Sequence, residues 1–295
     1  MKKLNIKNSL LLILAALIWG FAFVPQKLGG DAIGNFTFNC VRSFLGGLVL
    51  IPVILLMDRN KPEKKSADKK GLLIGGICCG IMLFLGSSLQ QIGLNSGADA
   101  GKAGFITALY MVIVPFFGLF IGKKLSPLVI LSVLIAVIGM YFLCISGDLS
   151  MAFGEYMVLA CAPCFALHIL VIDHFVQKHD GVKLSCIQFF TCGVLSVPFM
   201  FLFNTPVVSD IISVWPSLFY TGFLSSGVAY TLQIVGQKNM NPTVASILLS
   251  LESVFAVLGG MLLLNEALSM REIFGCVLMF AAIILTQIPQ KTKEI

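Results

Sequence analysis

The chain has 295 residues, of which 58% are hydrophobic and only 12% are charged. Soluble domains carry on average about 25% charged residues, so this chain has too few charges to cover a surface that faces water. The composition therefore excludes an ordinary soluble protein and predicts an all-α integral membrane protein. The formal net charge of +6 lies in short clusters between apolar runs, a pattern that does not fit a nucleic-acid-binding surface.

Ten apolar runs are long enough to cross the hydrocarbon core of a bilayer, which is roughly 30 Å thick. The runs cover residues 9–28, 34–57, 71–94, 101–122, 127–145, 153–173, 183–203, 213–236, 242–264 and 270–288. The first run begins like a secretory signal peptide but has no clear small-residue cleavage site. We therefore expect it to be retained, which gives ten transmembrane helices.

The basic residues predict how the chain is oriented in the membrane. If the N-terminus lies in the cytoplasm, 16 of the 20 Lys and Arg fall on the cytoplasmic side. Short cytoplasmic loops of membrane proteins carry an excess of Lys and Arg. The sequence thus predicts a multi-pass protein of the cell membrane with both termini in the cytoplasm.

The chain also shows signs of an internal duplication. The run LQQIG at 89–93 recurs as LQIVG at 232–236, a spacing of 143 residues, so that Gln90 corresponds to Gln233. Further matches upstream have nearly the same spacing, as for Cys40 with Cys186.

A duplication divides the chain into residues 1–147 and 148–295, with five predicted spans in each half. Because five is an odd number, the second half crosses the membrane in the opposite sense to the first. Inverted repeats of this kind are common in secondary transporters, where they place a substrate cavity between the halves near the bilayer midplane.

Two charged residues lie deep inside predicted spans, where a charge costs at least about 2.5–3.5 kcal/mol. Arg42 needs an acceptor or water inside the bundle, or else it reaches back to the interface. Glu252 lies near the middle of the ninth span. If it is unpaired, burial favours its neutral form, which suits a proton-coupling site. If it pairs with Arg42 or a substrate cation, it stays ionised. The alternative is a structural hydrogen bond between helices.

Aromatic and neutral polar residues add weaker candidates for the cavity wall, because small-molecule pockets use such groups. In the eighth span, the spacing of one helical stripe joins four residues: Ser226, Tyr230, Gln233 and Gln237. Packing in the core is the alternative for each of these residues. The residues that we expect to line the cavity besides Arg42 and Glu252 are Trp19, Tyr110, Tyr230 and Gln233.

Other polar groups allow further interpretations. Lys102 is either an anchor at the outer interface or a contact to an anion in the cavity. Cys161 and Cys164 form a CxxC pair with His168 nearby, so a membrane thiol oxidoreductase is an alternative function. A Cys-Cys-His trio is an incomplete ligand set, and we expect no metal site. The chain has no GxxxxGK[ST], HExxH or GxSxG motif, and we expect neither a cofactor nor an enzyme.

Four segments, spread over nearly the whole chain, resemble the EamA family of the drug/metabolite transporter superfamily. They are ALIWGFAFV (16–24), NCVRSFLGG (39–47), AGKAGFITALYMVIVPFFGLFIGKKLS (100–126) and ASILLSLESVFAVLGGMLLLNEALS (245–269). The resemblance implies ten spans, cytoplasmic termini and export or exchange of small metabolites. It carries over no particular substrate.

The resemblance also assigns family positions to single residues. It matches the tryptophan–glycine pair of the first span to Trp19-Gly20, the second-span arginine to Arg42, and the ninth-span glutamate to Glu252. The glutamate of the following loop matches Glu266. The family usually has a proline after the ninth-span glutamate, but here Ser253 follows, so the resemblance does not carry over a helix break at this point.

A second departure from the family pattern concerns the loop glutamate, because the first repeat has Lys123 where the second has Glu266. Taken together, the sequence predicts a secondary active transporter, an exporter or exchanger, that works by alternating access, with protons as a candidate coupling ion. A lipid flippase or a passive channel would share the same fold.

Overall fold

The structure, a computed structural model, describes residues 6–59, 68–120, 122, 127–144, 152–264 and 269–287. These residues form helices and no strand, and 8 helical stretches among them are long and apolar enough to cross a membrane. The fifth and tenth predicted spans coincide with shorter apolar helices, Pro127–Gly139 and Ile273–Ala282. The prediction of an all-helical membrane protein is confirmed over the described residues.

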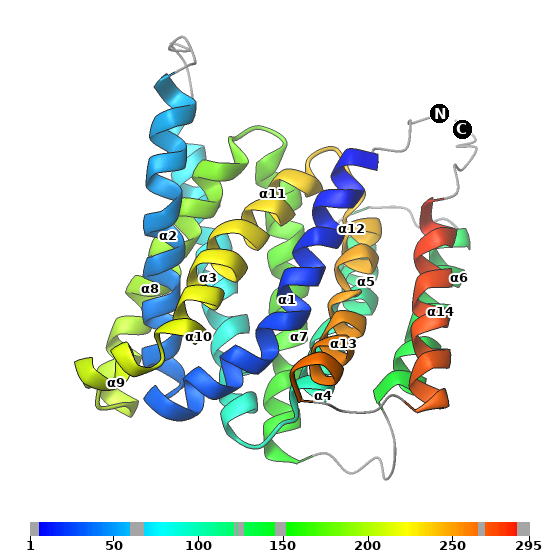
Figure 1. Ribbon diagram of the computed structural model, residues 1–295. Coiled ribbons are helices and arrows are strands. Elements are labelled where there is room, and N and C mark those ends of the chain that lie inside the picture. The colour runs from blue at the N-terminus through cyan, green and yellow to red at the C-terminus, as the bar shows by residue number, and fades with distance from the viewer. Residues whose placement is uncertain are drawn as a thin grey trace.

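The bundle of Figure 1 is built from helices that run across it in alternating directions. The first half comprises α1 (Ile6–Ile33), α2 (Asn35–Arg59), α3 (Lys69–Asn95), α4 (Ala100–Ala108), α5 (Tyr110–Phe120) and α6 (Pro127–Cys144). The second half comprises α7 (Phe153–Val176), α8 (Gly181–Phe203), α9 (Val208–Ser213), α10 (Trp215–Phe219), the π-helix η1 (Tyr220–Tyr230), α11 (Thr231–Gln237), α12 (Pro242–Leu249), α13 (Glu252–Leu264) and α14 (Met270–Gln287).

Side-chain caps fix where several of these helices begin. Asp180 accepts hydrogen bonds from the backbone N–H groups of Val182 and Lys183 at the start of α8. Asn241 accepts one from the N–H of Thr243, and Pro242 takes the first position of α12. Such caps satisfy N–H groups that have no partner within the helix.

The two faces of the bundle can be told apart by the helix ends. We call the face where α1 begins and α14 ends, at the top of Figure 1, the terminal face, and the other the opposite face. Gly30, near the end of α1, packs against Asn95 at the end of α3. Gly154, at the start of α7, packs against Gly93 of α3. The helix α7 therefore begins at the face where α1 ends, and the two run in opposite directions.

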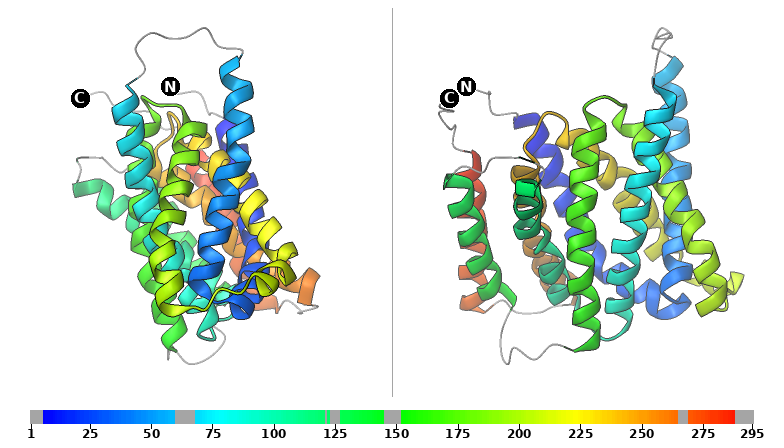
Figure 2. Two further views of the ribbon diagram at one scale, coloured as in Figure 1. Left: turned by 90° about the vertical axis from the view of Figure 1, so that its left-hand side faces the viewer. Right: turned by 180° about the vertical axis from the view of Figure 1, so that it is seen from behind.

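Contacts between the halves occur in matched pairs. The second helix of the first half, α2, packs against the second helix of the other half, α8. The long helix α3 of the first half packs against α7, the first helix of the second half. In the same way, η1 and α11 of the second half pack against α1, the first helix of the first half. The helices α6 and α14 pack against each other at one side of the bundle (Figure 2). A Cβ atom at Gly139 would lie 2.9 Å from the Gly275 carbonyl oxygen, so glycine allows the close approach of α6 to α14.

Large apolar side chains cover the outside of the bundle, whereas polar side chains lie inside. Leu55, Phe201 and Val277 are among the exposed apolar residues, and 27 polar or charged residues are buried. This distribution fits a protein whose surface is solvated by lipid, because a polar group facing hydrocarbon is costly. The interior polar groups define where a functional site can lie.

Candidate functional site

Two helices of the bundle are interrupted halfway across it. The first break separates α4 from α5 at Leu109, and the second separates α12 from α13 at Ser250 and Leu251. The backbone tightens at both, with N–H to carbonyl bonds over three residues from Val112 to Leu109 (2.9 Å) and from Ser253 to Ser250 (3.1 Å).

Serine side chains account for the second break. The Ser250 hydroxyl donates to the Ile247 carbonyl and the Ser253 hydroxyl to the Ser250 carbonyl, both at 2.8 Å. These bonds compete with the regular backbone pattern of the helix. Because the family proline is absent after Glu252, the resemblance gave no reason to expect a helix break at this point. The helix is nevertheless interrupted there.

The two breaks lie against each other in the bundle. The helix α4 contacts α13, and α5 contacts α12. At the 143-residue spacing of the duplication, Leu109 corresponds to Glu252. Each half therefore contributes one interrupted helix to the centre of the molecule, but of the two corresponding positions at the breaks only that of the second half is a charged residue.

A cavity of about 40 Å³ lies beside these breaks. This volume holds a few water molecules and is far below the ~300–1,000 Å³ of a pocket for a drug-sized ligand. All six residues named from the sequence line it together. Its lining consists of Trp19, Phe23, Gln26, Arg42, Gln90, Thr107, Tyr110, Phe165, His168, Ile169, Ser225, Tyr230, Gln233, Leu249 and Glu252.

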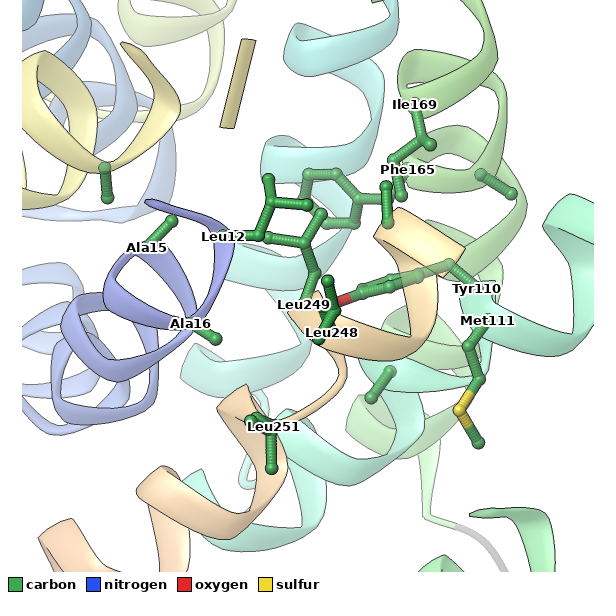
Figure 3. Close-up of a cluster of buried hydrophobic side chains, with 14 of the residues drawn as sticks. Leu12, Ala15, Ala16, Tyr110, Met111, Phe165, Ile169, Leu248, Leu249 and Leu251 are labelled. Carbon is green, nitrogen blue, oxygen red and sulfur yellow. The ribbon is translucent and has the colours of Figure 1, made fainter. Parts of the chain in front are cut away.

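Glu252 is buried in this cavity as the first residue of α13. The Tyr110 phenol faces its carboxyl group. Figure 3 shows the Tyr110 ring reaching from α5 toward Leu248 and Leu249 at the end of α12. Neither the Tyr110 hydroxyl nor Glu252 Oε1 has a hydrogen-bond partner within the described residues. The site therefore offers open acceptors to a proton, water or a ligand.

Arg42 is also buried, and it is held by uncharged groups. Its Nη1 donates to Gln26 Oε1, and its Cζ lies 5.7 Å from the centre of the Phe38 ring. Among the described residues, no ion pair joins Arg42 to Glu252. One cation and one carboxyl group thus line the same small cavity without neutralising each other.

Aromatic rings form a further part of the wall. The centres of the Trp19 and Tyr230 rings are 4.5 Å apart, and the Tyr230 ring also meets His168 edge-on at 5.9 Å. The Trp19 Nε1 donates to the Ser225 carbonyl at 3.3 Å. These contacts tie α1 to η1 and α7 on one side of the cavity.

The glycine after Trp19 brings α1 close to α13. A Cβ atom at Gly20 would lie 2.7 Å from both the Glu252 carbonyl oxygen and the Ala256 nitrogen. Only a glycine fits between these backbones without a shift, because 2.7 Å is well inside normal contact distance. This approach gives the tryptophan–glycine pair a physical role in placing Glu252.

The helical stripe expected in the eighth span is partly wrong. Residues 220–230 form a π-helix, in which residues five apart come into register. Ser225, five residues before Tyr230, therefore lines the cavity. Ser226 instead faces Gly46 of α2. Tyr230 and Gln233 reach the cavity as expected.

Several lining residues were missed from the sequence. Gln90 donates to the Thr107 hydroxyl at 3.0 Å, and it is the duplication partner of Gln233, which was a usable signal. His168 Nε2 lies 2.9 Å from Gln188 Oε1. Its position deep in the sixth predicted span was a second usable signal that this residue lines the cavity. Phe165, Ile169 and Leu249 look like ordinary core residues and gave no signal.

The remaining sequence candidates lie elsewhere. Cys161 is buried beside the Thr107 hydroxyl at 3.7 Å, Cys164 is half-buried, and both thiols are free. No group of three or more His, Cys, Asp or Glu residues suits a metal ion in the part of the chain that the structure describes. Lys102 pairs with Glu155 at 3.2 Å and does not line the cavity.

Three sequence features fall outside the described residues: Lys123, Glu266 and the expected boundary between the halves at 147–148. Within the described part, helices of spanning length surround a small cavity with buried polar and charged walls. This arrangement defines a multi-span membrane protein with a small polar cavity in its interior.

Comparisons with known proteins identify the family. A model of the EamA-like transporter family matches residues 6–145 and 152–288, and the chain belongs to this family, a branch of the drug/metabolite transporter superfamily. The chain is 33% identical to an uncharacterized transporter of Archaeoglobus fulgidus, over 94% of this chain and 84% of that one.

More distant relatives and a solved structure agree with this family. The uncharacterized transporter YoaV of Bacillus subtilis is 24% identical over 95% of this chain and 96% of its own. The uncharacterized inner membrane transporter YedA of Escherichia coli is 22% identical over 92% of this chain and 87% of its own. One crystal structure shares the fold with a TM-score of 0.74 at 19% identity, covering 95% of this chain and 96% of that one. The protein is therefore a membrane transporter.

Proposed function

We propose that the protein is a secondary active transporter that exports or exchanges small polar metabolites by alternating access. The observation that carries this proposal is the small cavity where two interrupted helices meet, which is lined by buried Arg42 and Glu252 with no ion pair between them among the described residues. A cavity this small releases a metabolite only if the surrounding helices move. The proposed activity is transport without catalysis.

The proposed architecture is ten spans in two inverted five-helix repeats, residues 1–147 and 148–295. Three observations support it: the family model matches the chain twice, α1 and α7 run in opposite directions, and contacts between the halves occur in matched pairs. We place the terminal face in the cytoplasm, because most Lys and Arg then lie inside.

The open groups of the cavity suggest the chemistry of the solute. Among the described residues, Glu252 Oε1 and Gln233 Oε1 have no hydrogen-bond partner and can accept hydrogen bonds. Arg42 can only donate. A solute that fits this cavity presents a donor, such as an amine or amide, toward Glu252 and an acceptor toward Arg42.

Protons are the proposed coupling ion. Among the described residues, no ion pair joins Glu252 to a cation, so its carboxyl group is available to take up a proton. A solute donor and a proton then compete for the same carboxyl group. Binding of one would release the other, which couples solute movement to proton movement in the opposite direction.

The test begins with a thermal-shift screen of the purified protein against a panel of small polar metabolites. A ligand of the folded state stabilises it by mass action, by about 2.7 kcal/mol at a concentration of 100 times Kd. A hit is then loaded into proteoliposomes. Exchange of labelled solute that is accelerated by a pH gradient supports a secondary transporter. Passive equilibration that ignores the gradient would instead indicate a channel.

A further inference from the structure

Beyond the cavity lie two sets of buried polar side chains, one toward each face of the bundle. The set toward the opposite face comprises Asn39, Ser88 and Gln91, on α2 and α3. The set toward the terminal face comprises Gln188, Gln233 and Gln237, on α8 and α11. Gln233 also lines the cavity. We call them the opposite-face set and the terminal-face set.

Gln91 of the opposite-face set belongs to a series of hydrogen bonds that leads from Arg42 in the cavity to exposed Asp31. Arg42 donates to the side chain of Gln26, whose backbone carbonyl accepts from Gln91 Nε2 at 2.9 Å. The same Gln91 nitrogen donates to Asn95 Oδ1 at 2.9 Å, and Asn95 donates to exposed Asp31 at 2.8 Å. Each link joins α1, α2 or α3, so this polar path lies among the first three helices.

The terminal-face set repeats this bonding among α7, α8 and α11. Gln237 Nε2 donates to the backbone carbonyl of Ile169, which itself lines the cavity, at 3.3 Å. One residue earlier on α7, His168 bonds Gln188 at 2.9 Å. Gln237 is the last residue of α11, directly before exposed Lys238. This polar path therefore leads to the other face.

Within the part of the chain that the structure describes, every member of both sets has one polar atom without a hydrogen-bond partner. These atoms are Asn39 Oδ1, Ser88 Oγ, Gln91 Oε1, Gln188 Nε2, Gln233 Oε1 and Gln237 Oε1. Buried polar atoms are nearly always hydrogen-bonded, to protein or to ordered water. Six such atoms, three on helices toward each face of the bundle, fit sites where water or a passing solute supplies the missing bonds.

The duplication by itself does not produce these two paths. At the 143-residue spacing, Gln91 corresponds to Ile234 and Gln237 corresponds to Leu94. Ile234 and Leu94 are both fully buried among apolar side chains. Each glutamine therefore has an apolar counterpart in the other half, and each path is polar toward one face only.

We propose that the two sets line separate half-routes for water and solute, with Gln91 serving the opposite face and Gln237 the terminal face. The inference rests on the proposed alternating access, in which the cavity opens to one face at a time. Both routes are lined by neutral amide and hydroxyl groups. They therefore suit a hydrated polar solute with hydrogen-bond donors and would hinder an apolar one.

The test measures from which face each position can be reached. Gln91→Cys and Gln237→Cys are reconstituted in vesicles, and a membrane-impermeant, charged methanethiosulfonate reagent is added to one face at a time. The reaction of the wild-type protein, which has nine native cysteines, is subtracted. Leu94→Cys and Ile234→Cys are the matched controls, because they lie one turn away on the same helices and are equally buried.

We expect Gln91→Cys to react only from the opposite face and Gln237→Cys only from the terminal face, each at least about tenfold faster than its control. Reaction no faster than the controls, or reaction of both variants from the same face, overturns the proposal. If a cysteine variant does not fold, hydroxyl-radical footprinting of the wild-type protein in vesicles replaces it. Footprinting should then oxidise the segments around Gln91 and Gln237 more than those around Leu83 and Ile172, and equal oxidation would overturn the proposal.

This experiment separates the inference from the proposed function, because labelling requires no substrate. Face-specific labelling without solute exchange would leave the half-routes standing and remove the transporter mechanism. If solute exchange is observed but both glutamine positions react no faster than their controls, the half-routes are overturned and the proposed transport function remains.

Discussion

The close approach of α1 to α13 gives a quantitative prediction for Gly20→Ala. The new Cβ atom would lie 2.7 Å from the Glu252 carbonyl oxygen and the Ala256 nitrogen, about 0.7 Å inside the 3.4 Å at which contacts become ordinary. Both atoms belong to the backbone of α13, so a side-chain rotation cannot relieve the clash. Overpacking of this kind costs about 1–3 kcal/mol.

The matched control is Gly101→Ala in α4, where an added Cβ meets nothing within 4 Å. Both substitutions gain up to about 1 kcal/mol of helix propensity, so their difference isolates the packing cost. Equilibrium unfolding in mixed micelles should therefore place Gly20→Ala about 1–3 kcal/mol below Gly101→Ala. Solute exchange should fall as well, because the shift moves Glu252. Equal stability of the two variants would refute the reasoning.

Three further predictions concern other contacts of the site. Arg42→Lys should lower exchange of the screened solute about tenfold or more, because an ammonium cannot reproduce the guanidinium fork; wild-type exchange would contradict this role. Replacing Cys161 and Cys164 together with Ser should leave exchange within about twofold of wild type, since both thiols pack among helices; its loss would revive the thiol oxidoreductase. A double-mutant cycle of Lys102→Met and Glu155→Gln should give a coupling of only about 0–1 kcal/mol, because the Lys102 side chain is 44% exposed. A coupling well above that range would show that the pair closes the bundle.

The 8 long apolar helices and the charged residues of the cavity could be predicted because a lipid environment restricts which sequences can cross a membrane. An apolar run of about 20 residues has few alternatives to a membrane helix. Arg42 and Glu252 stood out because charges within such runs are costly and must face the interior. Both line the cavity, together with the aromatic and amide residues expected beside them.

The local backbone could not be predicted from the same patterns. The break before Glu252 depends on hydroxyl bonds of Ser250 and Ser253, and serine occurs just as often in unbroken membrane helices. The π-helix at 220–230 makes Ser225 rather than Ser226 the serine that lines the cavity. The spacing of hydrophobic residues in the sequence does not predict this π-helix. The partner of Lys102 lies 53 residues away, so only the tertiary fold reveals their ion pair.

In the proposed mechanism, Glu252 couples solute movement to protons inside the cavity. The direct measurement is solute exchange in proteoliposomes with and without a pH gradient, for the wild-type protein, Glu252→Gln and Glu155→Gln. Glu155 is the control, because it is a carboxylate that pairs with Lys102 outside the cavity. The account predicts that the gradient accelerates exchange by the wild-type protein and Glu155→Gln but has no effect on Glu252→Gln. Unchanged gradient dependence in Glu252→Gln would contradict it.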